Sequence, residues 1–130
     1  KRWAEENPSG SRVDFVPGGL DMRMHYATAR VFALSSAREG QPNVILEAMA
    51  CGLPVCATSV GGIPRLVEPE GNGLLSPASD ADALARHCCR LLEDNALCDS
   101  MGIAGRQRVV RDFSFTAMVN AHEDVFSRLK

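Results

Sequence analysis

The chain has 130 residues and a formal net charge of -2, which fits one small domain and gives no basic field for binding nucleic acid. No apolar stretch is long enough to span a bilayer, and the sequence offers no signal peptide. The five cysteines include no Cys-x-x-Cys pair and the three histidines are scattered, so we expect reduced thiols in a cytosolic protein and no metal site.

In chain order, apolar runs of strand length alternate with segments of helical periodicity. The predicted strands are 12–16, 31–34, 55–57 and 73–75. The predicted helices are the end of a helix at 1–7, then 22–28, 44–51, 64–67, 80–93, 95–111 and 116–129. This alternation is typical of an α/β fold with a parallel sheet, in which ligands bind at the carboxyl ends of the strands.

Two glutamates, Glu39 and Glu47, flank the start of the helix predicted at 44–51. Apart from Glu47, all the side chains of this helix are apolar. The pattern therefore predicts a helix that is buried on all sides. A buried carboxylate is costly unless it is paired or hydrogen-bonded, and the neighbouring sequence offers Glu47 no partner. We therefore expect a ligand to supply one, although a buried arginine elsewhere in the chain is the structural alternative.

The start of this helix is predicted from its capping residues. Asn43 is a good N-cap after Pro42, while Gly52 and Pro54 end the helix. The free backbone N–H groups at such a helix start form an anion site. An anion there, with a hydroxyl-rich group beside the glutamates, describes a nucleotide sugar.

Five motifs in order resemble the C-terminal domain of retaining GT-B glycosyltransferases of group 1. They are 21–27 (DMRMHYA), 39–55 with Gly61-Gly62-Ile63-Pro64, 71–75 (GNGLL), 101–106 (MGIAGR) and 113–115 (FSF). The resemblance covers about residues 13–126 and implies a Rossmann-like domain. One departure is Arg65, where the family usually has an acidic residue.

The resemblance also implies roles for individual residues. Glu39 would be the catalytic residue, which contacts the donor sugar and shields the developing oxocarbenium charge. Without the surrounding motif, Glu39 would be interpreted as a solvated loop residue. Glu47 would bind the ribose hydroxyls. The other expected donor-binding residues are Gln41, the backbone N–H groups of Asn43, Val44 and Ile45, and Gly61 and Gly62, whose small size permits close backbone approach. His25 and Tyr26 are interpreted as packing residues.

The implied reaction is sugar transfer from a nucleotide-diphosphate sugar, with retention of configuration and without a metal or other cofactor. The acceptor would be a glycan or a lipid-linked glycan in polysaccharide biosynthesis, and the enzyme would be cytoplasmic or peripheral at the inner face of the membrane. Two alternatives remain open: a non-hydrolysing sugar-nucleotide epimerase, and a non-catalytic binding module with a degenerate glycosyltransferase fold.

The sequence shows no match to the family's N-terminal acceptor domain or to the basic Arg and Lys pair near the start of its C-terminal domain. We therefore expect residues 1–130 to be part of a longer protein and to supply its donor-binding half. The isolated chain is expected to be inactive and at best a weak nucleotide-sugar binder. The final helix, about 116–129, is expected to expose an apolar face that the N-terminal domain covers in the family.

Overall fold

The computed structural model describes residues 6, 12–17 and 21–129. Its centre is a parallel sheet of three strands in the order β1-β2-β3. The strands are β1 (Phe32–Leu34), β2 (Val55–Thr58) and β3 (Gly73–Ser76), with Phe32 opposite Val55 and Val55 opposite Gly73. A parallel sheet with helical crossovers confirms the predicted α/β, Rossmann-like fold class.

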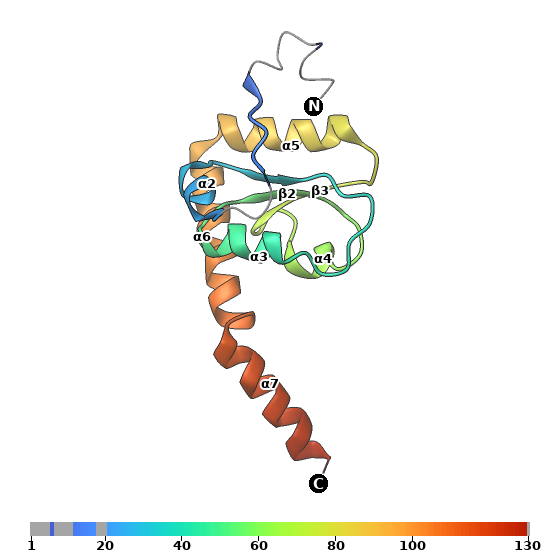
Figure 1. Cartoon of the computed structure of the whole chain (residues 1–130), viewed down its shortest axis with the longest axis vertical. Helices are drawn as coiled ribbons and strands as arrows, with labels where there is room; N and C mark the ends of the chain where they lie inside the picture. The colour runs from blue at the N-terminus through green and yellow to red at the C-terminus, as the bar shows by residue number, and fades with distance from the viewer. Residues whose placement is uncertain (1–5, 7–11, 18–20, 130) are drawn as a thin grey trace.

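Helices cover both faces of this sheet (Figure 1). On one face lie α3 (Asn43–Ala50) and the short α4 (Ile63–Leu66), and on the other lies α5 (Ala81–Glu93). The long α6 (Asn95–Asp112) runs along one side of these layers, while α7 (Phe115–Arg128) extends away from them. The first helix of the well-described region is α2 (Arg23–Thr28), which precedes β1.

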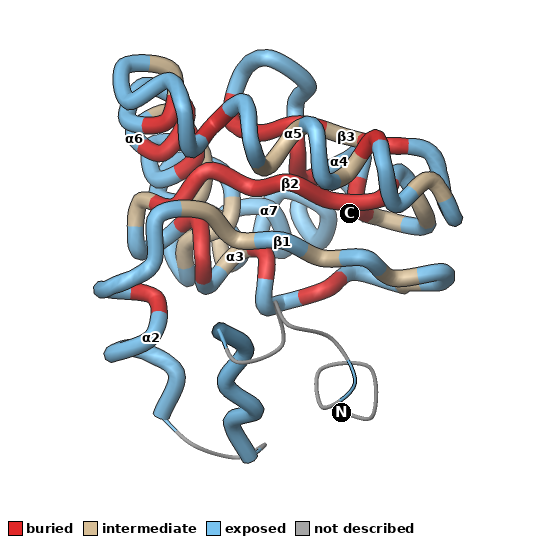
Figure 2. The backbone as a smooth tube through the Cα atoms, turned by 90° about the horizontal axis from the view of Figure 1, so that it is seen from above, coloured by how far each residue is buried: buried red, intermediate tan, exposed pale blue. Residues whose placement is uncertain are grey.

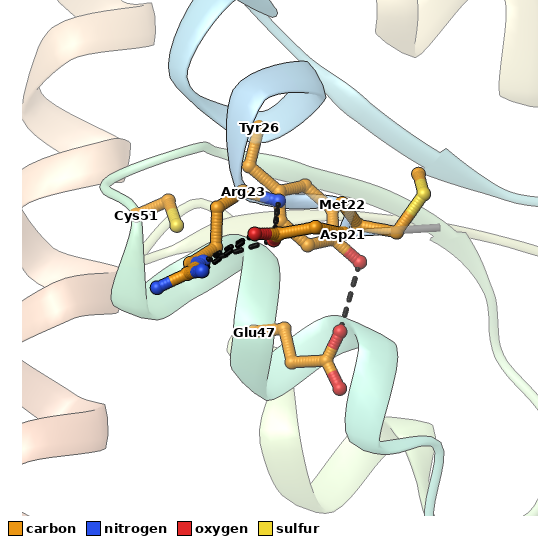
Figure 3. A pocket seen from close by; sticks show the side chains of 6 residues that line it. All are labelled: Asp21, Met22, Arg23, Tyr26, Glu47 and Cys51. Atoms are coloured by element: carbon orange, nitrogen blue, oxygen red, sulfur yellow. Dashed lines mark hydrogen bonds and ion pairs between the residues drawn. The ribbon is translucent and has the colours of Figure 1, made fainter. Parts of the chain in front are cut away.

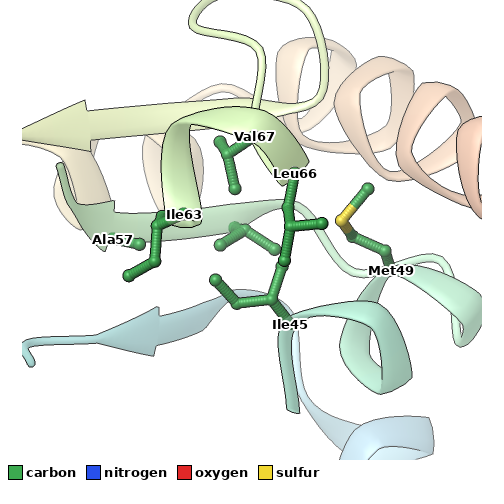
Figure 4. Packing of buried hydrophobic residues seen from close by; sticks show 7 residues of the cluster. Ile45, Met49, Ala57, Ile63, Leu66 and Val67 are labelled. Atoms are coloured by element: carbon green, nitrogen blue, oxygen red, sulfur yellow. The ribbon is translucent and has the colours of Figure 1, made fainter. Parts of the chain in front are cut away.

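The two sides of β2 form two apolar cores. Val55 and Ala57 pack with residues of α3 and α4, of which Figure 4 shows Ile45, Met49, Ile63, Leu66 and Val67. Cys56, on the opposite side, packs with Leu74, Leu91 and Met101. All four residues of β2 are buried, and Figure 2 shows this strand as the most continuously buried part of the chain. The central strand therefore holds both layers together.

Close packing of α6 against the body depends on two glycines. A β-carbon at Gly102 would lie 2.1 Å from the carbonyl oxygen of Gly52, and one at Gly105 would lie 3.3 Å from Met49. Farther along α6, Arg106 donates a 2.8 Å hydrogen bond to the carbonyl of Ala50 at the C-terminus of α3. A side chain of α6 thus pairs with a backbone carbonyl that the C-terminus of α3 leaves without a partner.

A buried asparagine holds the connection between α4 and β3. Asn72 is 2 % exposed, donates to the carbonyl of Leu66 at 3.2 Å and accepts the N–H of Glu68 at 2.8 Å. These bonds satisfy backbone groups at the end of α4 that the helix leaves unpaired. The side chain of Asn72 therefore fixes the turn that precedes β3.

Three sequence predictions are wrong: the strand at 12–16, the cap at Asn43 and the burial of the helix at 44–51 on all sides. Residues 12–17 form no strand, and Phe15 is 55 % exposed there, because no neighbouring strand pairs with this segment among the described residues. The side chain of Asn43 makes no cap hydrogen bond, since Pro42 occupies the cap position and Asn43 is the first helical residue. The helix end predicted at 1–7 lies outside the described residues except for Glu6.

The third wrong prediction is the burial of α3 on all sides. Ile45, Ala48 and Met49 face the core, but Val44 is 39 % exposed and Glu47 is exposed. Only one side of α3 packs against the sheet, so part of its apolar sequence remains outside the core. Glu47 therefore stands on the outer side of the helix rather than in a core.

Candidate functional site

The loops that follow β1 and β2 lie at one edge of the sheet, because the carboxyl ends of parallel strands point the same way. Residues 35–42 connect β1 to α3 and contain Glu39 and Gln41. Residues 59–62 connect β2 to α4 and contain Gly61 and Gly62. This edge brings together most of the residues that the sequence assigned to donor binding.

The loop that contains Glu39 is held by three hydrogen bonds. The hydroxyl of Thr58, at the end of β2, donates to the carbonyl of Ser36 at 2.6 Å. The hydroxyl of Ser36 then donates to Oε1 of Glu39 at 2.7 Å. From the next loop, the N–H of Gly62 donates to the carbonyl of Gly40 at 2.7 Å. The half-buried Glu39 carboxylate is thus fixed by its own strand end rather than free in solvent.

The two glycines after β2 pack against the backbone of this loop. A β-carbon at Gly61, whose φ is +53°, would lie 1.7 Å from the carbonyl oxygen of Glu39. A β-carbon at Gly62 would lie 2.3 Å from the carbonyl oxygen of Gly40. Close backbone approach was predicted toward a donor, but the approach seen here is to the chain's own loop. Contact of the two glycines with a donor stays a prediction.

Glu47 lies one turn into α3 and has a partner that the local sequence did not indicate. Tyr26 donates a hydrogen bond from Oη to Oε2 of Glu47 at 3.1 Å (Figure 3). The two residues are 21 positions apart, on α2 and α3. The expectation that Glu47 is buried and lacks a partner is therefore wrong, because α2 folds over the outer side of α3 at this point.

An open pocket of about 450 Å³ lies beside this pair. Its lining residues come from the start of α2 and from α3 and its C-terminal end: Asp21, Met22, Arg23, Tyr26, Glu47 and Cys51 (Figure 3). Arg23 and Asp21 form a bidentate ion pair, with Nε 2.9 Å from each carboxylate oxygen. Because they neutralise each other, Glu47 is the acidic group in this pocket whose charge no basic side chain balances among the described residues.

The pKa values follow from these contacts. Burial raises the pKa of the Tyr26 phenol, and the carboxylate of Glu47, which accepts its hydrogen bond, raises it further. The Tyr26 hydroxyl therefore stays protonated and remains a hydrogen-bond donor. The hydrogen bonds from Arg23 lower the pKa of Asp21, which stays ionised.

The first turn of α3 connects the Glu39 loop to Glu47. Asn43 and Val44 are exposed, and their backbone N–H groups are in the helix positions that lack an internal acceptor. The N–H of Ile45 donates to the carbonyl of Pro42 at 3.2 Å, and its side chain is fully buried. The anion site predicted from the helix start is therefore available at Asn43 and Val44, while Ile45 is already engaged.

Another pocket, of about 180 Å³, opens at the carboxyl edge of the sheet, on the side of α5. Its lining residues are Ser35, Thr58, Ser79, Asp80, Ala81 and Leu84. None of the predicted site residues lines it, so the larger pocket beside Glu47 is the better candidate.

Sequence reasoning assigned Tyr26 to packing and did not single out Asp21, Arg23 or Cys51. Tyr26 does pack, but its hydroxyl also reaches Glu47. The signal available in the sequence was that a buried tyrosine needs a partner for its hydroxyl and a buried glutamate needs a donor. Periodicity alone did not show that the two residues face each other.

Two further findings concern the whole described region. Over residues 6, 12–17 and 21–129, no group of three or more His, Cys, Asp or Glu side chains is placed to hold a metal ion. None of the helices in that part of the chain combines the length and the apolar character that a membrane span requires.

The parallel sheet, with its loops and helix start at the carboxyl edge, defines a Rossmann-like α/β domain, a class of fold in which ligands bind at that edge. Residues 2–94 match the family described as glycosyl transferases group 1, and the chain belongs to this family.

The most similar proteins are glycosyltransferases and related synthases. The D-inositol 3-phosphate glycosyltransferase of Salinispora tropica is 40% identical over 117 residues, which cover 88% of this chain and 24% of that protein. Sucrose-phosphate synthase from Thermosynechococcus elongatus superposes with a TM-score of 0.88 at 38% identity, over 98% of this chain and 33% of that one. Anabaena HepE, solved in complex with UDP-glucose, superposes with a TM-score of 0.82 at 27% identity, over 90% and 32% of the two chains. The chain thus spans about a quarter of the length of its curated relatives.

Proposed function

We propose that this chain is the donor-binding part of a glycosyltransferase that transfers a sugar from a nucleotide-diphosphate sugar with retention of configuration. The observation that carries the proposal is Glu47, an acidic group without a basic partner among the described residues, which lies at the wall of a pocket of about 450 Å³ and one turn after the open start of α3. A carboxylate that accepts from vicinal hydroxyls, next to backbone N–H groups that donate to an anion, suits a nucleoside diphosphate. The solved complex of HepE with UDP-glucose supports the same ligand class.

The predicted residues, Ile45 excepted, have roles in this proposal. Glu47 accepts hydrogen bonds from the ribose hydroxyls, and the N–H groups of Asn43 and Val44 bind the diphosphate or the sugar. Glu39 contacts the donor sugar and shields the positive charge that develops at its anomeric carbon. Gln41 and the backbone at Gly61 and Gly62 complete the donor site, whereas the N–H of Ile45, which the sequence also assigned to the donor, is bonded to Pro42.

The leaving diphosphate would be stabilised by the helix start and by basic groups, without a metal or other cofactor. The acceptor would be a glycan or a lipid-linked glycan in polysaccharide biosynthesis, bound by a separate N-terminal domain, and the enzyme would act in the cytoplasm or at the inner face of the membrane. We expect the 130-residue chain alone to catalyse no transfer. Membership of the glycosyltransferase family favours this function over a sugar-nucleotide epimerase.

A binding experiment tests the proposal directly. Saturation-transfer NMR with UDP, GDP and ADP should show that the chain binds a nucleotide, and the preferred base would identify the donor class. Glu47→Ala should weaken that binding about tenfold or more, because charged hydrogen bonds to two hydroxyls are lost.

Glu93→Ala is the matched control, because Glu93 is an exposed glutamate at the end of α5, away from the pocket. It should bind as the unaltered chain does. Equal binding by the Glu47 and Glu93 variants would show that the ribose is not held by Glu47, and a non-catalytic module would then be the better interpretation.

A further inference from the structure

Glu47 needs a fixed orientation in order to bind a ligand well, and its own helix does not provide one. Its side chain is exposed on the outer side of α3 and has several rotatable bonds. Oε2 accepts the hydrogen bond from Tyr26, and Oε1 has no hydrogen-bond partner among the described residues. Tyr26 is therefore the group that selects one orientation of the carboxylate.

Tyr26 is itself held in place by the core. It is 7 % exposed and packs in one cluster with Ala48 and Leu53. Its ring meets Phe32 of β1 edge to face, with centroids 6.1 Å apart. The position of the hydroxyl is thus set by contacts with the sheet and with α3, before any ligand arrives.

The other polar groups of the pocket do not compete for Glu47. Arg23 is engaged with Asp21 through Nε and Nη2, and both side chains are largely exposed. In Figure 3 this pair lies together, while the Tyr26 hydroxyl points at the carboxylate of Glu47. The hydrogen bond from Tyr26 is thus the direct link between α2 and Glu47, the residue predicted to bind the ribose.

We propose that Tyr26 is a positioning residue, which holds Oε2 of Glu47 so that Oε1 faces the pocket and accepts from the ribose hydroxyls of a nucleoside diphosphate. This inference rests on the proposed function. Fixing the carboxylate in advance lowers the conformational entropy that binding would otherwise lose. The hydroxyl of Tyr26 contributes through Glu47 and makes no contact with the ligand of its own.

Tyr26→Phe tests this role, because it removes the hydroxyl and keeps the ring that packs on Phe32. Binding of UDP and GDP should be measured alongside their 2′,3′-dideoxy forms, which lack the hydroxyls that Glu47 would bind. We expect Tyr26→Phe to weaken binding of the ribonucleotide about three- to tenfold and to leave the dideoxy form unchanged. In the background of Glu47→Ala, Tyr26→Phe should have no further effect.

Thr28→Val is the matched control from the same helix. The Thr28 hydroxyl donates only to the carbonyls of Met24 and His25, so its loss should not change nucleotide binding. An equal loss of ribose and dideoxy binding in Tyr26→Phe would show that the ring environment, and not Glu47, is disturbed. That result would overturn the inference.

A second measurement needs no ligand, because Tyr26 is the single tyrosine of the chain. Absorbance titration of the phenol should show that Glu47→Gln lowers the pKa of Tyr26, since a neutral amide no longer opposes the phenolate. An unchanged pKa would show that the two side chains do not meet in solution, and would also overturn the inference.

The outcomes separate the two proposals. If the unaltered chain binds none of UDP, GDP and ADP, the proposed function fails and this inference fails with it. If the chain binds a nucleotide through Glu47 and Tyr26→Phe binds it equally well, the proposed function stands and the positioning role is wrong.

Discussion

At the residue scale, the position of Glu39 depends on the absence of a side chain at residue 61. Gly61 combines a φ of +53° with a β-carbon position 1.7 Å from the Glu39 carbonyl oxygen. Ordinary loop glycines relieve backbone strain, but this one also leaves room for the neighbouring loop. The glycine pair after β2 therefore shapes the candidate site through the chain's own backbone.

The first prediction follows from this contact. Gly61→Ala should destabilise the fold by about 3 kcal/mol or more and weaken nucleotide binding, because the loop with Glu39 must move away. Gly52→Ala is the control: Gly52 has a φ of +80° with no atom within 4 Å of its β-carbon position, so only backbone strain of about 1–2 kcal/mol is expected. Urea denaturation measures both, and equal losses would contradict the steric explanation.

The second prediction concerns the thiol at the pocket wall. Cys51 lines the pocket with Glu47 and is exposed, so a bound nucleotide should slow its alkylation by iodoacetamide. Cys89 is also exposed but lies on α5, and its alkylation should not change. Mass spectrometry of the two peptides compares them in one sample. Protection of neither thiol at saturating nucleotide would place the ligand elsewhere.

At the element scale, the sequence predicted the three strands of the sheet and the long helices closely. The strand predicted at 55–57 is β2 (Val55–Thr58), and the helix predicted at 95–111 is α6 (Asn95–Asp112). Apolar runs and capping residues such as Asp80 and Asp94, which accept from Ala83 and Leu97, mark these boundaries in the sequence itself.

What the sequence could not predict depends on contacts between distant elements. The segment 12–17 has the composition of a strand, but a strand needs a neighbour to pair with. Tyr26 of α2 reaches Glu47 on the exposed side of α3, and no periodicity within α3 reveals this contact. The residues of the candidate site were therefore predicted from the resemblance to the family. The contact of Tyr26 with Glu47 could be seen only in the structure.

The third prediction tests how α6 supports α3. Arg106→Ala should lower the free energy of unfolding by about 1 kcal/mol, because the carbonyl of Ala50 loses the guanidinium that caps it. Gln107→Ala, at an exposed position on the same helix, should change stability little. Thermal or chemical denaturation compares the two variants, and equal stabilities would show that water replaces the arginine at no cost.

At the scale of the whole molecule, α7 has no buried residue and extends from the body (Figure 1). Several of its large apolar side chains are exposed, with Phe115 at 77 %, Val125 at 58 % and Phe126 at 64 %. The apolar face predicted for this helix is therefore present. Exposed apolar surface of this kind favours association between molecules.

The fourth prediction is that the 130-residue chain associates with itself as its concentration rises. Phe126→Ser should weaken the association, because it removes a large exposed ring, whereas Asn120→Ser on the same helix should not. Sedimentation equilibrium over a range of concentrations measures the effect. A chain that stays monomeric throughout would show that α7 packs differently in solution.

The complete burial of β2 also bears on how the candidate donor site can change during evolution. Three of its four residues belong to the two apolar cores. In contrast, Glu39 and Gln41 lie on a loop, and Glu47 lies on the outer side of a helix. In the proposed donor site, substitutions at these positions would change ligand choice with little effect on folding, so new specificities would arise by small steps. Gly61 and Gly62 are the exceptions, because a side chain at either one collides with the backbone next to Glu39.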